Sequence, residues 1–283
     1  MGLVVGEISY TNIRPMFHYL NRERLASFSF VPAIPAELNK KMAAGMIDVG
    51  GISSFAYGQN IDDYHVLADL SVSSYQQVGS IFLFTKKKLE ELDGEPIALT
   101  SSSATSVHLL KILLRHFYRV EPRFYTQDPD FNEMMERASA CLLIGDDAIR
   151  AKWNHEAEYF CYDLGKLWYE HTGLPMTYAV FAVRKEMAAL YEESLASLYE
   201  GFHESKRMCK SNHYHDLITS IQREHGGTFT FWQSYFAKLN HDLTSDHLDG
   251  LHMYYDLAYQ YGYLSKPVKE ISVWNPVSPF HSV

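Results

Sequence analysis

Residues Ile97–Leu114, IALTSSSATSVHLLKILL, predict a short buried strand, a loop of small hydroxyl residues and an amphipathic helix. Six hydroxyl residues lie from Thr100 to Ser106, although one is enough to cap the helix. The surplus hydroxyl groups lie beside the unpaired N–H groups of the helix, whose partial positive charge suits a carboxylate or a phosphate. An over-hydroxylated cap without a ligand is the alternative interpretation.

Strands and helices alternate on both sides of this unit, which predicts an α/β protein with parallel, helix-covered sheets. Further strands are expected at Leu3–Tyr10, Ser27–Ile34, Met46–Ile52, Val66–Ser74, Arg123–Thr126 and Cys141–Ile144, and helices at Pro35–Ala44 and Asn132–Ala140. Two apolar runs that lie far apart, Ile81–Phe84 and Tyr178–Val183, are expected to link two such sets. The predicted architecture therefore has two lobes, residues 1–84 with 181–283 in the first and residues 85–180 in the second, with a ligand cleft between them.

Beyond Arg184 the sequence predicts a succession of helices that continues to Leu264. The expected helices are Lys185–Cys209, Tyr214–His225, Phe229–Leu239 and Ser245–Gly262. The segment Ser265–Val283 contains Pro267, Pro276 and Pro279 and is expected to be irregular.

The composition is globular, with 283 residues of which 47% are hydrophobic and 21% charged. A net charge of −9 disfavours a nucleic-acid partner, because phosphate binding needs clustered lysine and arginine. No apolar run reaches the length of about 18 residues that a membrane span requires. The cysteines Cys141, Cys161 and Cys209 are odd in number and widely spaced, as is typical of a reducing compartment. With no export signal at the N-terminus, we expect a cytoplasmic protein.

The sequence offers few of the patterns that common catalytic and metal sites require. The 14 histidines show no zinc-binding spacing, and neither a nucleophile elbow nor a glycine-rich phosphate loop is present. We therefore expect no metal and no cofactor. The adjacent Asp146 and Asp147 could act as general acid or base, or one of them could cap the helix that starts near Ala148.

Polar side chains follow strand ends in both predicted lobes, where ligands collect in open α/β sheets. They are Asn12, Arg14, Ser53 and Ser54 in the first lobe, Ser101–Ser106 and Gly145–Asp147 in the second, and Gln77 and Ser80 on the segment that leads into the hinge. This set is rich in neutral hydrogen-bond donors and holds one arginine, which could clamp a carboxylate or lie over Phe17 on the surface. The sequence therefore predicts a small dianion held between two closing lobes.

A series of motifs in fixed order resembles the chorismate dehydratase family of the futalosine route to menaquinone. The motifs are N-I-R-P (Asn12–Pro15), G-x-I-D (Gly45–Asp48), I-S-S (Ile52–Ser54), D-L-S-V-x-S (Asp69–Ser74), Q-V-G-S-I (Gln77–Ile81), S-A-T-S-V (Ser103–Val107), L-L-I-G-D-D-A (Leu142–Ala148), Y-D-L-G (Tyr162–Gly165) and T-G-L-P-M (Thr172–Met176). The resemblance covers about Leu3–Arg184. It implies a two-lobed fold like that of type II periplasmic binding proteins, and a lyase that removes water from chorismate to give 3-[(1-carboxyvinyl)oxy]benzoate.

The resemblance also implies roles for individual residues. Asn12 and Ser80 match residues that contact substrate and are expected to act in catalysis through hydrogen bonds. The loop residues Ser103, Thr105 and Ser106 are expected to hold a carboxylate. The other predicted substrate contacts are Arg14, Ser53, Ser54, Gln77 and Asp147. Because no base is evident, we expect the enolpyruvyl carboxylate of the substrate itself to take the proton.

Two other functions fit parts of the pattern. A 1,4-dihydroxy-6-naphthoate synthase of the same pathway shares the fold, but its S-P-C-P-N-D motif is replaced by Tyr10–Pro15. A non-catalytic protein that binds a small anion is the alternative from a different class, because fold alone does not fix function. The expected partner in each case is a small molecule, and a homodimer is compatible with the sequence.

Overall fold

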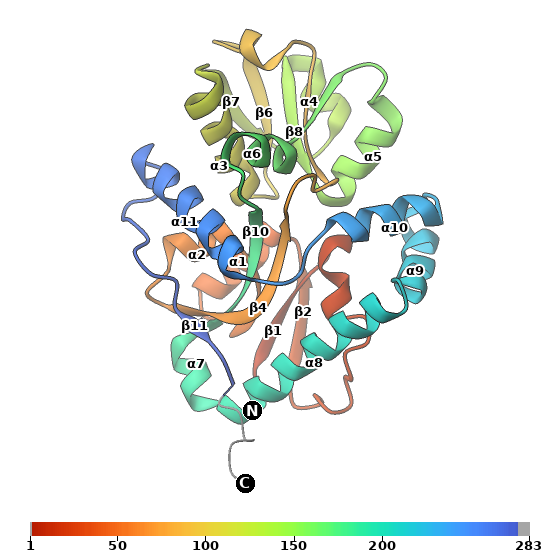
Figure 1. The fold of residues 1–283 in the computed structure, drawn as a ribbon, viewed down its shortest axis with the longest axis vertical. Coiled ribbons are helices and arrows are strands. Elements are labelled where there is room, and N and C mark those ends of the chain that lie inside the picture. The colour runs from red at the N-terminus through yellow and green to blue at the C-terminus, as the bar shows by residue number, and fades with distance from the viewer. Residues whose placement is uncertain (1, 277–283) are drawn as a thin grey trace.

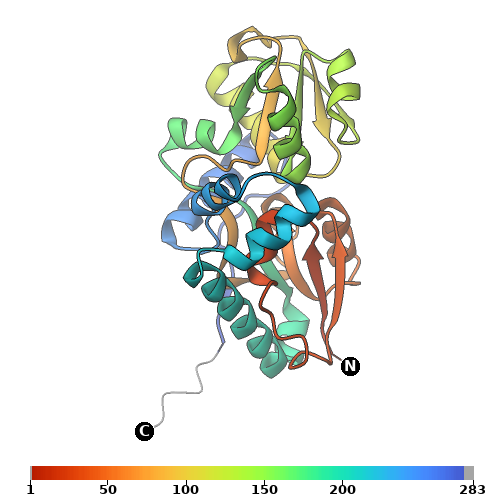
Figure 2. The same cartoon turned by 90° about the vertical axis from the view of Figure 1, so that its right-hand side faces the viewer.

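The computed structural model describes residues 2–276, and these form two lobes, one above the other in Figure 1. The lower lobe contains the N-terminal and C-terminal parts of the chain, and the upper lobe contains its middle part. The side view in Figure 2 shows the same division. Each lobe is built on its own β-sheet.

The sheet of the first lobe has the strand order β11-β4-β10-β3-β1-β2. Its strands are β1 (Val4–Ile8), β2 (Ser29–Ala33), β3 (Val49–Ser53), β4 (Tyr64–Ser74), β10 (Met176–Arg184) and β11 (Val273–Trp274). The pairs β1–β2 and β1–β3 are parallel. Strand β10 is antiparallel to both of its neighbours, β3 and β4.

The sheet of the second lobe has the order β7-β6-β8-β5-β9. Its strands are β5 (Ile81–Thr85), β6 (Pro96–Thr100), β7 (Arg123–Gln127), β8 (Ala140–Ile144) and β9 (Phe160–Asp163). Strand β6 is parallel to β7 and β8, whereas β5 is antiparallel to β8 and β9. Both sheets are therefore mixed.

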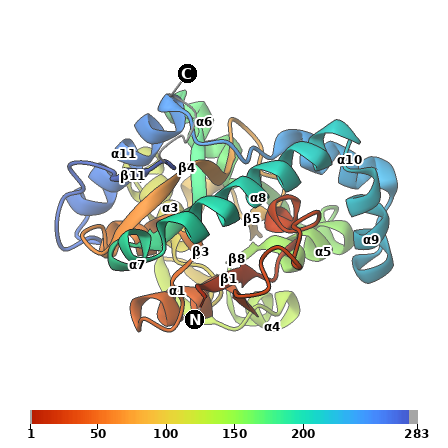
Figure 3. The same ribbon diagram turned by 90° about the horizontal axis from the view of Figure 1, so that it is seen from below.

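Helices pack on the two sheets. In the second lobe they are η2 (Leu89–Glu91), α3 (Thr105–Ile112), η3 (Leu113–Tyr118), α4 (Phe131–Arg137), α5 (Gly145–His155) and α6 (Leu164–Thr172). The remaining ones are η1 (Thr11–Met16), α1 (Pro35–Ala43), α2 (Ser54–Gln59), α7 (Lys185–Leu190), α8 (Glu192–Ser211), α9 (His215–His225), α10 (Phe229–Lys238) and α11 (Ser245–Gln260). Seen from below, α8 crosses the first lobe with α7 and α9 at its two ends (Figure 3).

The expectation of purely parallel sheets is wrong at β5 and β10. Each of these strands enters its sheet across the hinge from the other lobe, instead of following a helix that packs on the same sheet. The chain crosses between the lobes at residues 75–80 and 173–175, because each apolar run lies whole within one sheet. The predicted boundaries after residue 84 and before residue 181 fall at the end of β5 and inside β10.

Four further elements differ from the prediction. Strand β9 and helix α6 were absent from it, since β9 is an edge strand with mostly half-buried side chains and little alternation. The predicted helix Lys185–Cys209 is broken at Tyr191, whose backbone is not helical (φ −128°, ψ 38°). In the segment expected to be irregular, β11 pairs in parallel with β4; Pro279 and its neighbours 277–283 lie outside the described residues.

None of the helices within residues 2–276 combines the length and the apolar character that crossing a bilayer requires.

Candidate functional site

A small cavity lies between the two lobes and is lined by residues from both. The lining includes Asn12, Ser53, Val72 and Tyr178 from the first lobe, and Ile81, Ser103, Ser106, Ile144 and Gly145 from the second. Its volume is about 40 Å³, which accommodates water but no metabolite. The lobes therefore stand in a closed arrangement around the place where the sequence predicts a ligand.

Three helices begin at this cavity. The lining residue Ser53 caps α2, and its hydroxyl accepts from the Ala56 N–H at 3.1 Å. Helix α3 begins at Thr105, between two lining residues, and α5 begins at the lining residue Gly145. The N-terminal ends of helices carry partial positive charge, so the cavity suits an anion although no cation among the described residues lines it.

The hydroxyl loop before α3 is mostly engaged in structural hydrogen bonds. Ser103 lies just before the N-cap residue Ala104, and its hydroxyl accepts a hydrogen bond from the Ser106 N–H at 3.2 Å. Ser101 donates to Asp128, and Thr100 and Ser102 pair with each other at 2.7 Å. Only Ser103 and Ser106 of this loop line the cavity, so the loop offers a ligand fewer groups than its sequence predicts.

Two buried hydrogen-bonded contacts join the lobes beside the cavity. Asp146 of α5 accepts from the Thr11 hydroxyl at 2.5 Å and from the Thr11 N–H at 3.3 Å. The hydroxyl of Thr105 accepts from the Phe55 N–H at 3.0 Å. Asp146 therefore holds the lobes together and does not cap α5, while Asp147 forms an ion pair with Arg150.

Asn12 reaches the cavity from η1, and its side-chain oxygen is buried without a hydrogen-bond partner among the described residues. Such an unpaired acceptor costs about 1–3 kcal/mol unless water or a ligand meets it. The backbone of Asn12 is fixed from behind, because its carbonyl oxygen accepts a hydrogen bond from His241 Nε2 at 2.7 Å. The orphaned oxygen is therefore held in place and suits a hydroxyl donor on a ligand.

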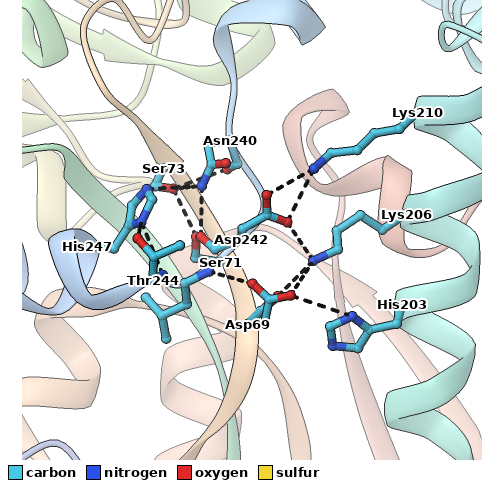
Figure 4. Close-up of polar contacts among 11 residues, drawn as sticks. Asp69, Ser71, Ser73, His203, Lys206, Lys210, Asn240, Asp242, Thr244 and His247 are labelled. Carbon is cyan, nitrogen blue, oxygen red and sulfur yellow. Dashed lines mark hydrogen bonds and ion pairs between the residues drawn. The ribbon is translucent and has the colours of Figure 1, made fainter.

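The segment that carries His241 is tied to β4 and α8 (Figure 4). Asn240 pairs with Ser73 through both backbone groups and through its side chain at 2.9 Å. On the other side of His241, Asp242 accepts from Lys206 at 2.8 Å and from Lys210 at 3.0 Å. Burial acts to raise the pKa of Asp242, but the two lysines lower it to about 2. Burial lowers the pKa of His241 itself to about 4, so its imidazole is neutral at pH 7.

Ser80 is fully buried directly behind the cavity wall, to which its neighbour Ile81 belongs. Its hydroxyl accepts from the Tyr235 hydroxyl at 3.0 Å, and its carbonyl oxygen accepts from the Gly145 N–H at 2.7 Å. Burial raises the pKa of Tyr235, so this phenol remains a donor. The proton of the Ser80 hydroxyl is left without an acceptor among the described residues.

Several predicted contacts lie away from the cavity. Arg14 forms an ion pair with Glu224 and lines a separate surface groove. Gln77 is exposed and accepts from Lys238 at 3.2 Å. Ser54 is buried and donates to the Thr177 carbonyl at 2.8 Å. The residues that the structure brings together at the cavity are thus Asn12, Ser53, Ser103 and Ser106, with Thr105 and Ser80 just behind them.

Tyrosines are the only titratable side chains that line the described cavity. Burial raises the pKa of Tyr10 to about 12, and burial raises that of Tyr178 well above its ordinary value. Both therefore act as hydrogen-bond donors and not as bases near pH 7.

Sequence reasoning missed three residues that support the site: His241, Tyr235 and Thr11. They lie on segments without a catalytic motif, and each acts on the site through a contact that is distant in sequence. The only local signal that could have drawn attention to His241 was its place in the short loop between two helices.

Comparison with known proteins gives a consistent family and fold. A family model described as menaquinone biosynthesis matches residues 3–260. A chorismate dehydratase from Thermus thermophilus is 36% identical over 197 residues, which cover 65% of this chain and 70% of that protein.

Solved structures share the architecture at low sequence identity. Protein AF1704 from Archaeoglobus fulgidus has a TM-score of 0.74 and 19% identity, over 93% of this chain and 98% of that one. The periplasmic aliphatic sulphonate binding protein SsuA from Escherichia coli has a TM-score of 0.68 and 14% identity, over 97% and 92% of the two chains. The predicted α/β fold of the periplasmic-binding-protein type is confirmed.

The hydrogen bonds between the lobes are expected to keep the cleft closed. In the double variant Thr11→Val and Thr105→Val, two hydroxyl groups that join the lobes are lost while the side-chain volumes are kept. We expect a larger radius of gyration by small-angle X-ray scattering, because the closed form loses two of the hydrogen bonds between its lobes. Ser101→Ala removes a hydroxyl bonded within one lobe and serves as the control. An unchanged radius in the double variant would contradict this role.

Because His241 is buried, we expect the free energy of unfolding to fall as the pH is lowered. Its pKa is about 4 when folded and about 6.5 when unfolded, so the unfolded chain binds more protons between these values. Stability from this group is present above pH 6.5 and is lost as the pH falls toward 4. Between pH 7 and pH 5, His241→Gln should therefore reduce the fall in unfolding free energy by about 2 kcal/mol, measured by urea denaturation. His252→Gln, a half-buried position on α11, is the control and should leave the fall unchanged.

Proposed function

This chain belongs to the menaquinone biosynthesis family, and from that membership we propose that it is a chorismate dehydratase. The reaction breaks the bond between a ring carbon and its hydroxyl group, removes a ring hydrogen as a proton, and releases water. The product is 3-[(1-carboxyvinyl)oxy]benzoate, and the new aromatic ring supplies the driving force. The name of the Thermus relative carries this proposal, and the anion-binding geometry of the cleft supports it.

The closed cleft must open before chorismate can enter. Sites for small molecules usually measure about 300–1,000 Å³, whereas the cavity between the lobes measures about 40 Å³. We propose that the lobes part at residues 75–80 and 173–175 and close again over the substrate. Closure then excludes water from a ring that is to lose its hydroxyl group.

The substrate carboxylates are held by helix N-termini and hydroxyl groups. Ser103 and Ser106 at α3 and Ser53 at α2 supply hydroxyl groups around one space, and the N-terminal end of α5 adds partial positive charge. Arg14 is paired with Glu224 in its own groove and does not line the cavity in the closed form. This set is narrower than the one the sequence predicts, because Ser54, Gln77 and Asp147 point to other partners.

Asn12 and Ser80 are proposed to act on the reacting ring. The buried Asn12 oxygen can accept from the substrate hydroxyl and so orient the group that leaves. Ser80 keeps a hydroxyl proton to donate, because Tyr235 supplies a hydrogen bond to its oxygen. Donation to the departing oxygen stabilises the charge that develops as the carbon–oxygen bond breaks.

The base in this mechanism is a carboxylate of the substrate. No Asp, Glu, His or Lys lines the described cavity, and the lining tyrosines have raised pKa values. The enolpyruvyl carboxylate is held next to the ring carbon that loses the proton. The protein therefore contributes orientation and exclusion of water, while the substrate supplies its own base.

The enzyme is proposed to act in the cytoplasm, with a single small-molecule substrate. All three cysteines are free thiols, and Cys141 and Cys209 are buried. Free thiols in a chain of this size are typical of a reducing compartment.

Removing either proposed catalytic side chain should abolish most turnover. We expect Asn12→Ala and Ser80→Ala to lower kcat for chorismate by about a hundredfold or more, since each loses a hydrogen bond made in the transition state. Formation of the aromatic product is followed by ultraviolet absorbance, and circular dichroism checks the fold. Ser211→Ala, an exposed hydroxyl at the end of α8, is the matched control. Binding of chorismate by the wild-type protein without conversion would instead support a solute-binding function.

A substrate analogue tests the origin of the base. A chorismate analogue that lacks the enolpyruvyl carboxylate should bind through its ring carboxylate but should not be dehydrated, because no protein base replaces the missing group. Turnover is measured by the same absorbance, and binding by calorimetry. Dehydration of the analogue at the rate of chorismate would show that a protein group takes the proton.

A further inference from the structure

A second and much larger cavity lies outside the cleft, between α10 on one side and α5 and α6 on the other. Its volume is about 400 Å³, which falls within the usual range for small-molecule sites of about 300–1,000 Å³. Figure 1 shows α10 lying below α5, with the hinge segment beside them. Gln77 and Gly79 of that segment belong to the cavity wall.

One part of the wall is aromatic. Trp153 of α5 meets Phe231 of α10 edge to face, with ring centroids 4.9 Å apart. Tyr235 lies parallel to Phe231 one helical turn further along. Trp153 remains 39% exposed, so a large part of its ring is free to stack on a flat ligand.

The other part of the wall carries positive charge. Lys152, Lys166 and Lys238 all line the cavity. The carboxylates nearest to Lys152 and Lys166 lie 3.4 and 3.6 Å away on exposed side chains, and Lys238 meets only the Gln77 amide. Such exposed pairs contribute little, so the ammonium groups remain available to an anion.

Two carboxylates also line the cavity, and each of them already has partners within the protein. Glu170 is the partner of Lys166. Asp163 is turned to the backbone, where it accepts from the N–H groups of Val78 and Gly79 at 3.2 and 2.8 Å and caps α6. The lining therefore holds one more lysine than carboxylates, and Glu156, the partner of Lys152, lies outside it.

We propose that this cavity is a second ligand site, which takes a small aromatic carboxylate. The aromatic ring stacks on Trp153 and Phe231, and the carboxylate is held by Lys166 and Lys238. The site is separate from the cleft between the lobes and does not depend on the proposed function.

Occupation of this site would act on the cleft through two residues. A ligand there bridges α10 to α5 and α6 of the second lobe and so favours the arrangement in which they are close. It also contacts the ring of Tyr235, whose hydroxyl holds Ser80. The site is therefore placed to change the population of the closed form.

Benzoate is the probe for the test, with inorganic phosphate as the non-aromatic anion. Binding is measured by isothermal titration calorimetry on the full chain, and quenching of tryptophan fluorescence reports contact with Trp153. We expect one benzoate site, weakened about tenfold or more in the double variant Lys166→Ala and Lys238→Ala. The quenching should disappear in Trp153→Phe. Lys40→Ala, an exposed lysine on α1, is the matched control and should leave the affinity unchanged.

Asn12→Ala distinguishes the two cavities, since it alters only the cleft. Benzoate binding that survives in Asn12→Ala supports the second site. Binding lost in Asn12→Ala but kept in the double lysine variant would place benzoate in the cleft and overturn the proposal. The same holds if benzoate does not bind, or if phosphate binds as tightly as benzoate. These outcomes decide whether the second site exists, and none of them tests whether the chain dehydrates chorismate.

Discussion

One of the contacts that join the lobes in the closed form centres on a buried carboxylate, that of Asp146. Taking a carboxylate out of water is unfavourable, and the cost is met here by two hydrogen bonds from Thr11 and by the first turn of α5. Thr11 precedes Asn12, and Asp146 follows Gly145, so this contact brings the two cavity-lining residues to the same place. The geometry of the cleft thus follows from a contact that is polar, buried and lost on opening.

No arginine lines the described cavity between the lobes. The sequence contains one conspicuous candidate, Arg14, but its guanidinium is paired with Glu224 in another groove. Helix N-termini supply the positive potential instead, and their fixed N–H groups need no reorganisation when the lobes close. A mobile cation in the cavity would carry a desolvation cost in the empty closed form, which the helix ends avoid because their dipoles are built into the backbone.

The elements that were predicted correctly are those whose sequence signals lie within one short stretch of the chain. The strand and helix around Ser103 were predicted because their periodicity and capping signals lie within one short stretch, and the Ser103 hydroxyl accepts from the Ser106 N–H at the start of α3. The strands other than β9 and β11 were also predicted in their chain order, but not the antiparallel direction of β5 and β10, which depends on where the hinge lies. At the site, the hydroxyl of Thr105 could not be assigned from sequence, because its partner Phe55 belongs to the other lobe. His241 was missed for the same reason, since its effect on Asn12 exists only in three dimensions.

The hinge residues between the two cavities are held by hydrogen bonds to backbone N–H groups and to the Ser80 hydroxyl, and not by ion pairs within the described chain. Asp163 accepts from the N–H groups of Val78 and Gly79, and the next residue, Ser80, receives the hydrogen bond of Tyr235. Burial raises the pKa of Asp163, while these backbone donors favour its charged form. Any rotation about residues 75–80 must change these contacts, and the same residues border the outer cavity at Gln77 and Gly79. The hydrogen bond from Tyr235 thus ties Ser80, at the end of the hinge segment, to α10.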